Sequence, residues 1–278
     1  GVELDRGLRD AVRVLQGGIS SRPSFSLAFG LLSEPHWDAM SPDAPLRGIV
    51  VHAVLEDFVK SVVVDPANLT RAHLLEIANG TLADLVPWPA ARTIWLARLA
   101  RIADWFIEAE RARLATASPI AFEDDARGLL ELPDLAFTIR GVADRIDRNA
   151  AGEIQIYDYK TGNPPTDKQQ KHFDKQLLIE AAMVEEGAFR KIGAAPVSRA
   201  TFIGLGNPPV EQHAPLEEEP PAVVLENLRK LIAAYLDPEQ GFTARRMMEK
   251  VVFAGEFDHL ARFGEWDGSD PAQPEDLT

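Results

Sequence analysis

The segment Ile154-Gln-Ile-Tyr-Asp-Tyr-Lys160 constrains this chain more than any other. In an extended strand the side chains alternate between faces, so the two isoleucines share a face with Asp158 and Lys160. The isoleucines indicate that this face meets a core, yet the strand delivers an acid and a lysine at its end. Burying either charge alone is costly, so we expect compensation by a metal ion, by the partner charge or by a hydrated cleft.

Composition excludes several classes of protein. The 278 residues are 46% hydrophobic and 26% charged, which is typical of a globular chain. No apolar run approaches the roughly 20 residues that span a bilayer, so we expect no membrane partner. The absence of cysteine excludes disulfides, thiolate catalysis and an iron–sulfur cluster. We expect a cytoplasmic protein and, because it begins with Gly1, a product of processing or a fragment.

The charge balance at first argues against nucleic acid, since the net charge is −14 and the pI about 4.9. The acids, however, gather away from the strand motif, at Glu217–Glu219 and in the tail from Glu265 to Asp276. Basic residues surround the motif, and the local field matters more for binding than the total. They are Arg140, Arg145, Arg148, Lys160, Lys168, Lys171 and Lys175.

The pattern between residues 48 and 116 predicts helices. From Gly48, apolar residues recur at three- and four-residue spacing, and a second helix capped by Asn68 or Thr70 is expected to run to about Leu85. Residues 90–115 form the longest amphipathic segment, after a break at Pro87–Pro89. Residues 1–46 give no clear pattern.

Beyond Pro119 the pattern changes to strands. Residues 120–131, 135–146 and 153–159 predict an antiparallel meander. A helix over 167–186 ended by Gly187, a strand over 198–205 and a helix over 220–236 should follow. The order predicts an α/β fold with a mixed central sheet.

The predicted hairpin should bring Asp144 close to Asp158. Two carboxylates at such short range repel unless a cation lies between them. The alternative is that Asp144 forms a salt bridge with Arg145 or Arg148, and that Asp158 and Lys160 form a surface ion pair. Such alternatives stay open when each residue is taken alone.

Two helices carry polar pairs at four-residue spacing, which share one face. His52 and Glu56 lie on the first helix, where His52 is the better metal-ligand candidate and Glu56 would support it. Gln176 and Glu180 lie on the helix after the strands. Each pair can also be purely structural. Lys168, Lys171 and Lys175 either line a phosphate path or form an exposed side.

Taken together, these motifs resemble the PD-(D/E)XK nuclease superfamily in its RecB-type branch. The family runs G-x-x-x-H-x-x-L-E, G-x-x-D with a downstream Asp, D-Y-K-[ST]-G and Q-x-x-x-Y. The corresponding segments here begin at Gly48, Gly141, Asp158 and Gln176. Only the last departs, with Glu180 in place of tyrosine. The closing segment 257–266 is similar to the end of AddB-type helicase–nuclease subunits.

The resemblance implies a restriction-endonuclease-like αβββαβ core over 47–240, a helical insertion at about 65–117 and a C-terminal extension over 241–278. It implies catalytic roles for Asp144, Asp158, Lys160 and Gln176, with Mg²⁺ or Mn²⁺ held by His52, Asp144, Asp158 and Tyr159. Supporting roles fall to Glu56 and Glu180. DNA contacts fall to Arg145, Lys168, Lys171 and Lys175.

The implied activity is metal-dependent, exonuclease-like hydrolysis of DNA in double-strand-break repair and recombination, beside a helicase–nuclease partner subunit. A second hypothesis is an inactive nuclease-fold module that binds DNA or scaffolds such a complex. A third, hydrolysis of a small phosphate ester, has only the acids in its favour. No G-x-x-x-x-G-K-[ST] phosphate loop occurs, so an ATPase motor of that kind is excluded.

Overall fold

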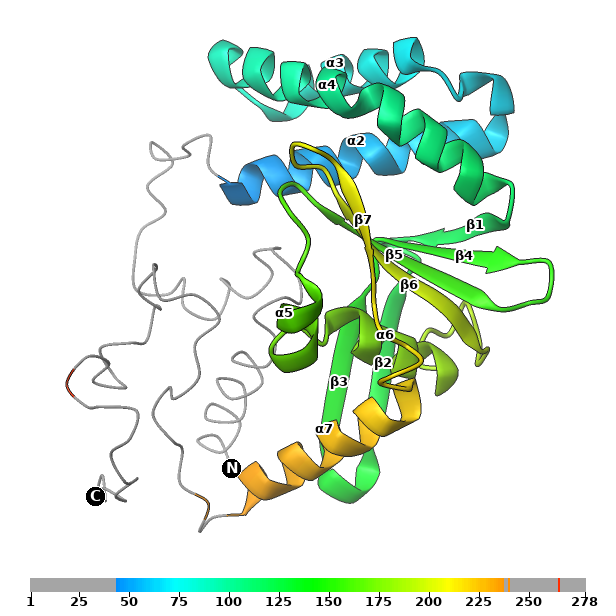
Figure 1. Cartoon of the computed structure of the whole chain (residues 1–278), viewed down its shortest axis with the longest axis vertical. Helices are drawn as coiled ribbons and strands as arrows, with labels where there is room; N and C mark the ends of the chain where they lie inside the picture. Colours follow the sequence, from blue (N-terminus) through cyan, green and yellow to red (C-terminus); the bar gives the residue numbers. More distant parts are fainter. Residues whose placement is uncertain (1–43, 238–239, 241–264, 266–278) are drawn as a thin grey trace.

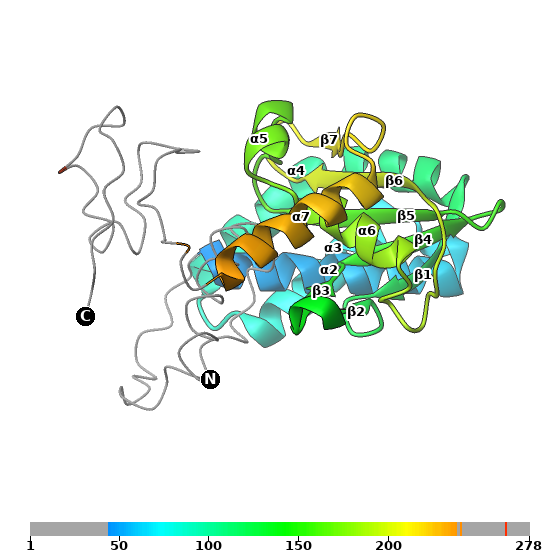
Figure 2. The same ribbon diagram turned by 90° about the horizontal axis from the view of Figure 1, so that it is seen from below.

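The protein has helices on both faces of a central sheet (Figures 1 and 2). The structure is a computed structural model, and it describes residues 44–237, 240 and 265. The sheet order is β1-β4-β5-β6-β7, and within the described residues only β5 and β6 pair in parallel. The expected α/β class with a mixed sheet is confirmed. The strands are β1 (Ala117–Phe122), β4 (Arg145–Asn149), β5 (Ile154–Lys160), β6 (Val197–Gly204) and β7 (Val210–His213).

Three helices cover one face of the sheet (Figure 1): α2 (Ala44–Val64), α3 (Arg71–Leu85) and α4 (Pro89–Leu114). The short helix η3 (Pro66–Asn68) joins the first two. Thr70 caps α3, because its side-chain oxygen accepts the backbone N–H of His73. The helices expected between residues 48 and 115 are therefore confirmed, with Thr70 rather than Asn68 as the cap.

The other face is covered by α6 (Gln176–Glu185) and α7 (Pro221–Leu236), beside a separate hairpin of β2 (Arg127–Leu132) and β3 (Phe137–Val142). The short helix η4 (Pro133–Leu135) links those two strands. The short helix α5 (Asp167–His172) follows β5.

Side chains alternate along β5, so each face of this strand packs into a different hydrophobic cluster. Ile154 and Ile156 are fully buried in the cluster that includes α6 and α7. Tyr157 and Tyr159 belong to the opposite cluster, with α2 and α4. Burying each isoleucine stabilises the fold by roughly 1.5–3 kcal/mol. The predicted division of faces is confirmed, and both faces meet a core.

The predicted meander is partly wrong. Segment 153–159 does pair antiparallel with the end of 135–146, as β5 and β4. Segment 120–131 breaks at 123–126, however, and segment 135–146 breaks near its end, at 143–144. The parts nearest their connecting turn form the separate β2–β3 hairpin. The second break falls at Asp144, whose carboxylate Oδ2 accepts the backbone N–H of Tyr159 (2.8 Å). Short acidic side chains compete in this way with regular ladder bonds.

The predicted helix over 167–186 is also broken in two. Asp174 interrupts it, and the Asp174 carboxylate accepts the backbone N–H of Gln176, the first residue of α6. Gly187 ends α6 with a φ of 72°, which favours glycine. Strand β7 went unpredicted because its four residues are too few to show a period of two.

In the part of the chain that the structure describes, no helix is long and apolar enough to cross a membrane. Residues 1–43 and most of 241–278 lie outside that part. The segment over 257–266, which is similar to the AddB end, is therefore outside the described residues except for Glu265.

Candidate metal and catalytic site

Two neighbouring β-ladders end at the same place and bring three acids together. The β1–β4 ladder stops just before Glu123 and Asp144, and the Glu123 backbone N–H donates to the Asp144 carbonyl (3.3 Å). The register of β4 with β5, continued by one residue, sets Asp144 opposite Asp158. These carboxylates come from separate segments, and strand pairing gathers them at one edge.

His52 reaches this edge from α2. Its Nε2 lies 2.7 Å from the backbone carbonyl oxygen of Tyr159 and donates to it, since a carbonyl can only accept. Its Nδ1 lies 3.4 Å from Asp144 Oδ1 and 3.5 Å from Glu123 Oε1. One imidazole therefore contacts three oxygen-bearing groups.

The crowded carboxylates shift one another's pKa values. Burial lowers the pKa of His52, but Asp144 and Glu123 outweigh it and hold that pKa well above its usual value. Burial raises the pKa of Asp144, but His52 outweighs it, and the pKa of Asp144 lies below its usual value. Burial, then the charge of Asp144, raises the pKa of Asp158 to about 6. A cation here would relieve the repulsion between the acids.

Asp158 and Lys160 are linked through an amide on α6. Asp158 Oδ1 accepts from Gln176 Nε2 (2.6 Å), and Lys160 Nζ donates to Gln176 Oε1 (2.9 Å). Lys160 Nζ also lies 2.9 Å from Asp158 Oδ2. Because both ends of the amide are engaged, the orientation of Gln176 is fixed and the lysine is held beside the acid.

Glu180, one turn along α6, completes this group. Gln176 Nε2 also donates to Glu180 Oε1 (3.2 Å), while Glu180 Oε2 is buried without a hydrogen-bond partner. Burial, then the charge of Asp158, raises the pKa of Glu180 well above its usual value. The neutral, protonated form is therefore favoured at this position.

The donor set fits a divalent cation. One ligand atom each from His52, Glu123 and Asp144 lie within 4.8 Å of one another, with the Tyr159 carbonyl oxygen beside them. Carboxylate and carbonyl oxygens suit Mg²⁺ and Mn²⁺, and a neutral imidazole is a common metal ligand. Asp158 is outside this three-residue group, since its carboxylate is engaged by Gln176 and Lys160.

Glu123 was missed by the sequence analysis. It stands in the run Glu123-Asp124-Asp125, which reads as a polar turn. Only the pairing of β1 with β4 brings its carboxylate to His52 and Asp144. No local spacing signals that pairing, because the two strands are separated by the whole β2–β3 hairpin.

The other expected residues lie further away. Glu56 pairs with Lys60 on its own helix (2.7 Å), and Lys175 pairs with Glu219. Lys168 and Lys171 are exposed on α5. Their predicted contacts with DNA remain predictions.

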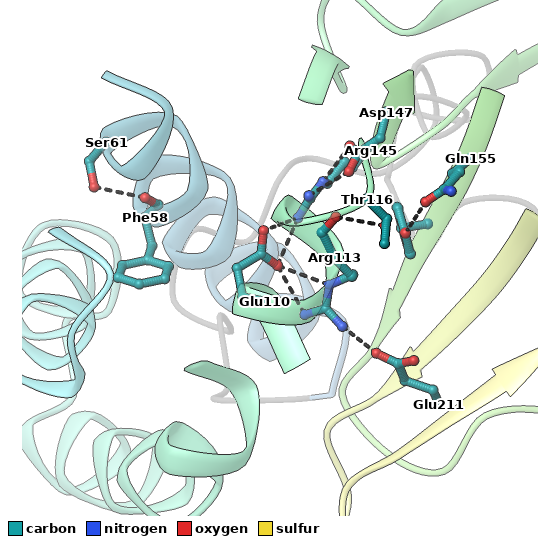
Figure 3. A network of polar contacts seen from close by, with 10 residues as sticks. Phe58, Ser61, Glu110, Arg113, Thr116, Arg145, Asp147, Gln155 and Glu211 are labelled. Atoms are coloured by element: carbon teal, nitrogen blue, oxygen red, sulfur yellow. Dashed lines mark hydrogen bonds and ion pairs between the residues drawn. The ribbon is translucent and has the colours of Figure 1, made fainter. Parts of the chain in front are cut away.

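Arg145 is wrongly predicted to contact DNA. It is fully buried, and its guanidinium donates to both carboxylate oxygens of Asp147 (each 2.6 Å) and to Glu110 of α4 (2.7 Å). Arg113 continues this network from Glu110 to Glu211 of β7 (Figure 3). Strand β4 turns Arg145 towards α4, so the residue ties helix to sheet.

Residues 26–251 match the PD-(D/E)XK nuclease superfamily. This match covers well over half of the chain, and the chain belongs to that superfamily. The five-stranded mixed sheet agrees with the restriction-endonuclease-like fold of the family. Nucleases of this family generally use divalent metal ions.

Similar curated proteins occur in Rickettsia, and all are named as uncharacterized. The one from Rickettsia conorii is 30% identical over 168 residues, which are 58% of this chain and 20% of the relative. Those from Rickettsia bellii and Rickettsia typhi are each 31% identical over 51% of this chain and 17% of the relative. The chain thus spans about a fifth of the length of these relatives.

Proposed function

We propose that this protein is a divalent-metal-dependent deoxyribonuclease that hydrolyses phosphodiester bonds in DNA. One observation supports this most: Lys160 is held by Asp158 and Gln176 directly beside the His52–Glu123–Asp144 group. A fixed ammonium next to a set of candidate metal ligands is suited to orient a water molecule for attack on a phosphate.

His52, Asp144, Asp158 and the Tyr159 carbonyl would hold Mg²⁺ or Mn²⁺, and Glu123 adds a carboxylate that the motif did not include. When bound, the ion supplies Lewis-acid stabilisation of charge on the phosphoryl oxygens. For Asp158 to join these ligands, its carboxylate must be ionised, and Lys160 favours that form.

Lys160 orients and polarises the attacking water, and Gln176 keeps the lysine in position. The water oxygen forms a bond to phosphorus while the P–O3′ bond breaks, leaving a 5′-phosphate on one product. The proton of the water leaves to solvent, and the departing 3′ oxygen gains one from solvent. Removing Lys160 or Asp158 should therefore affect the rate more than the fold.

The RecB-type motifs and the likeness of 257–266 to AddB proteins support a more specific role. We infer that the enzyme is exonuclease-like and acts in double-strand-break repair and recombination in the cytoplasm. From the same motifs we infer a helicase–nuclease partner subunit.

The test is cleavage of linear duplex and single-stranded DNA with Mg²⁺, Mn²⁺ or EDTA. We expect metal-dependent cleavage that falls by at least about 100-fold in Asp158→Ala and Lys160→Ala. Circular dichroism should show both variants folded. Cleavage that neither substitution reduces would contradict the proposed deoxyribonuclease site.

A second function, a nuclease-fold module that only binds DNA or scaffolds a complex, is favoured by Glu180, which departs from the family tyrosine. Calorimetry with Mn²⁺ separates the two. A live site should bind Mn²⁺ and lose that binding in Asp144→Ala, whereas no binding of Mn²⁺ by the wild type would favour the module. Metal binding without cleavage would indicate that a partner subunit is missing.

A further inference from the structure

A pocket of about 270 Å³ opens beside the candidate site, between α2, α4 and the ends of β5 and β6. Arginine side chains from the two helices line it. Apolar residues, among them Val51, Trp95 and Leu99, line it as well, and all three are largely buried. The pocket is therefore amphipathic, with cationic groups next to apolar surface. The arginines are Arg47, Arg98 and Arg101.

Among the described residues, these arginines have no anionic partner. No carboxylate in the described part of the chain pairs with any of the three, and Arg47 Nε is buried without a hydrogen-bond partner. Other arginines of α4 do have such partners: Arg111 pairs with Glu108, and Arg113 with Glu110. In a chain with 43 acids and 29 basic residues, a group of arginines that no carboxylate of the described residues pairs with indicates a site for an external anion.

Two of these arginines, Arg47 and Arg98, also repel each other. Burial, then the nearby charge of Arg98, lowers the pKa of Arg47. Like charges held together are destabilising unless a counter-charge arrives. A phosphate would supply it, because a guanidinium can bind phosphate oxygens through two parallel hydrogen bonds.

Two residues that line the pocket are sequence neighbours of candidate site residues, one on α2 and one at the end of β5. Val51 immediately precedes His52 on α2, and Thr161, another lining residue, immediately follows Lys160. A chain of linked phosphates that reaches Lys160 can therefore continue into the pocket.

We propose that this pocket binds one unpaired nucleotide of a single-stranded DNA segment, next to the phosphate at the catalytic site. The arginines bind the nucleotide phosphate, and the apolar lining receives the sugar and base. An unpaired base can enter a pocket of this kind, whereas a base stacked within a duplex cannot. The choice of DNA rests on the proposed nuclease function, but binding in the pocket requires neither metal nor cleavage.

The test measures anisotropy of a labelled oligothymidylate of about 20 nucleotides, in EDTA, with the full chain. Arg98→Ala/Arg101→Ala should raise the dissociation constant at least about tenfold. It should also flatten the salt dependence by about 1.4 log units per log unit of salt, since two phosphate contacts are lost at about 0.7 each. Both arginines are exposed, so the double variant should fold.

The matched control is Arg111→Ala/Arg127→Ala, which removes the same charge from exposed arginines outside the pocket lining. It should change the dissociation constant less than twofold. An equal loss in this control would overturn the pocket in favour of general charge attraction. Tighter binding of a 20-base-pair duplex than of the single strand would overturn the unpaired-nucleotide assignment.

Competition distinguishes a nucleotide from a bare anion. Thymidine 5′-monophosphate should displace the oligonucleotide at a lower concentration than inorganic phosphate, because its base and sugar contact the apolar lining. Equal competition by the two would overturn the proposal. The nuclease function fails separately: binding in EDTA without any metal-dependent cleavage removes the enzyme and keeps the pocket. Metal-dependent cleavage combined with unaltered DNA binding by Arg98→Ala/Arg101→Ala keeps the enzyme and overturns the pocket.

Discussion

At the scale of single residues, Glu180 is unusual because its carboxyl group is only 1% exposed and lies near the acids Asp158 and Asp144. Gln176 offers it one hydrogen-bond donor, which the Asp158 carboxylate shares. Ionising Glu180 would bury a second negative charge beside Asp158, so the protonated form persists and its pKa is raised.

Replacing Glu180 with glutamine should stabilise the metal-free protein at neutral pH. A raised pKa means that the native state loses stability as pH rises from the unfolded pKa of 4.5 through the folded pKa. The loss is about 1.4 kcal/mol for every tenfold difference between the acid dissociation constants of the folded and unfolded states. Glu180→Gln removes this titration, so its free energy of unfolding should fall less than that of the wild type as pH rises from 4.5 to neutrality.

Urea unfolding in EDTA across that pH range measures the effect. The control is Glu186→Gln, which changes an exposed glutamate at the end of the same helix. It should leave the pH dependence of the wild type intact. If Glu180→Gln shows the same pH slope as the wild type, Glu180 is ionised in the native protein.

Several site residues could be named because the order of the motifs resembles a known family, and others could not. For His52, Asp158 and Lys160 the spacing alone left structural alternatives open, and the order of the motifs along the chain favoured a site. Glu123 depends on which strand pairs with which, and that information is absent from any single segment. The burial of Arg145 was likewise hidden, since its partner Glu110 lies 35 positions upstream.

At the scale of elements, α4 is joined to the sheet by charge as well as by packing. Arg145 of β4 lies between Glu110 and Asp147, and its guanidinium lies 5.2 Å from the centre of the Tyr157 ring (Figure 3 shows the ion pairs). Buried ion pairs of this kind stabilise a fold only while every partner is present.

Arg145→Met should therefore destabilise the protein by about 3–5 kcal/mol, because it leaves the buried carboxylate of Asp147 without its guanidinium. Arg127→Met breaks only the exposed pair with Asp124 and should cost at most about 1 kcal/mol. Urea denaturation of the two variants provides the comparison. Equal costs would mean that Arg145 contributes only by packing.

The boundaries of elements were harder to predict than their existence. Helices α3 and α4 followed from apolar periodicity and from the prolines between them. The break of the long strand at Asp144 could not be foreseen, because it depends on a hydrogen bond to Tyr159, fifteen residues away. A strand interruption that depends on such a distant contact leaves no sign in the alternation of apolar and polar residues along the strand.

At the scale of the whole molecule, the candidate metal site joins the helical layer to the ends of the sheet strands, at a place separate from the Glu110–Arg145 ion pair. His52 belongs to the helical layer, while Asp144 and Glu123 belong to the ends of sheet strands. A bound cation would therefore link these parts, and binding only to the folded state raises its stability.

Saturating Mn²⁺ should raise the melting temperature of the wild type. At 100 times the dissociation constant the gain is about 2.7 kcal/mol. Asp144→Ala should show no such gain, and differential scanning calorimetry makes the comparison. A similar rise in the variant would attribute the effect to the many surface acids instead.

The buried position of Arg145 also bears on how such a site can be moved between proteins. Asp144 owes its place to a strand that Glu110 of α4 secures from behind, through the very next residue. A protein engineer who transplanted only β4 and β5, with the candidate site residues beside them, would leave that anchor behind. The smallest transferable cassette therefore includes the end of α4, even though α4 contributes none of the candidate metal ligands.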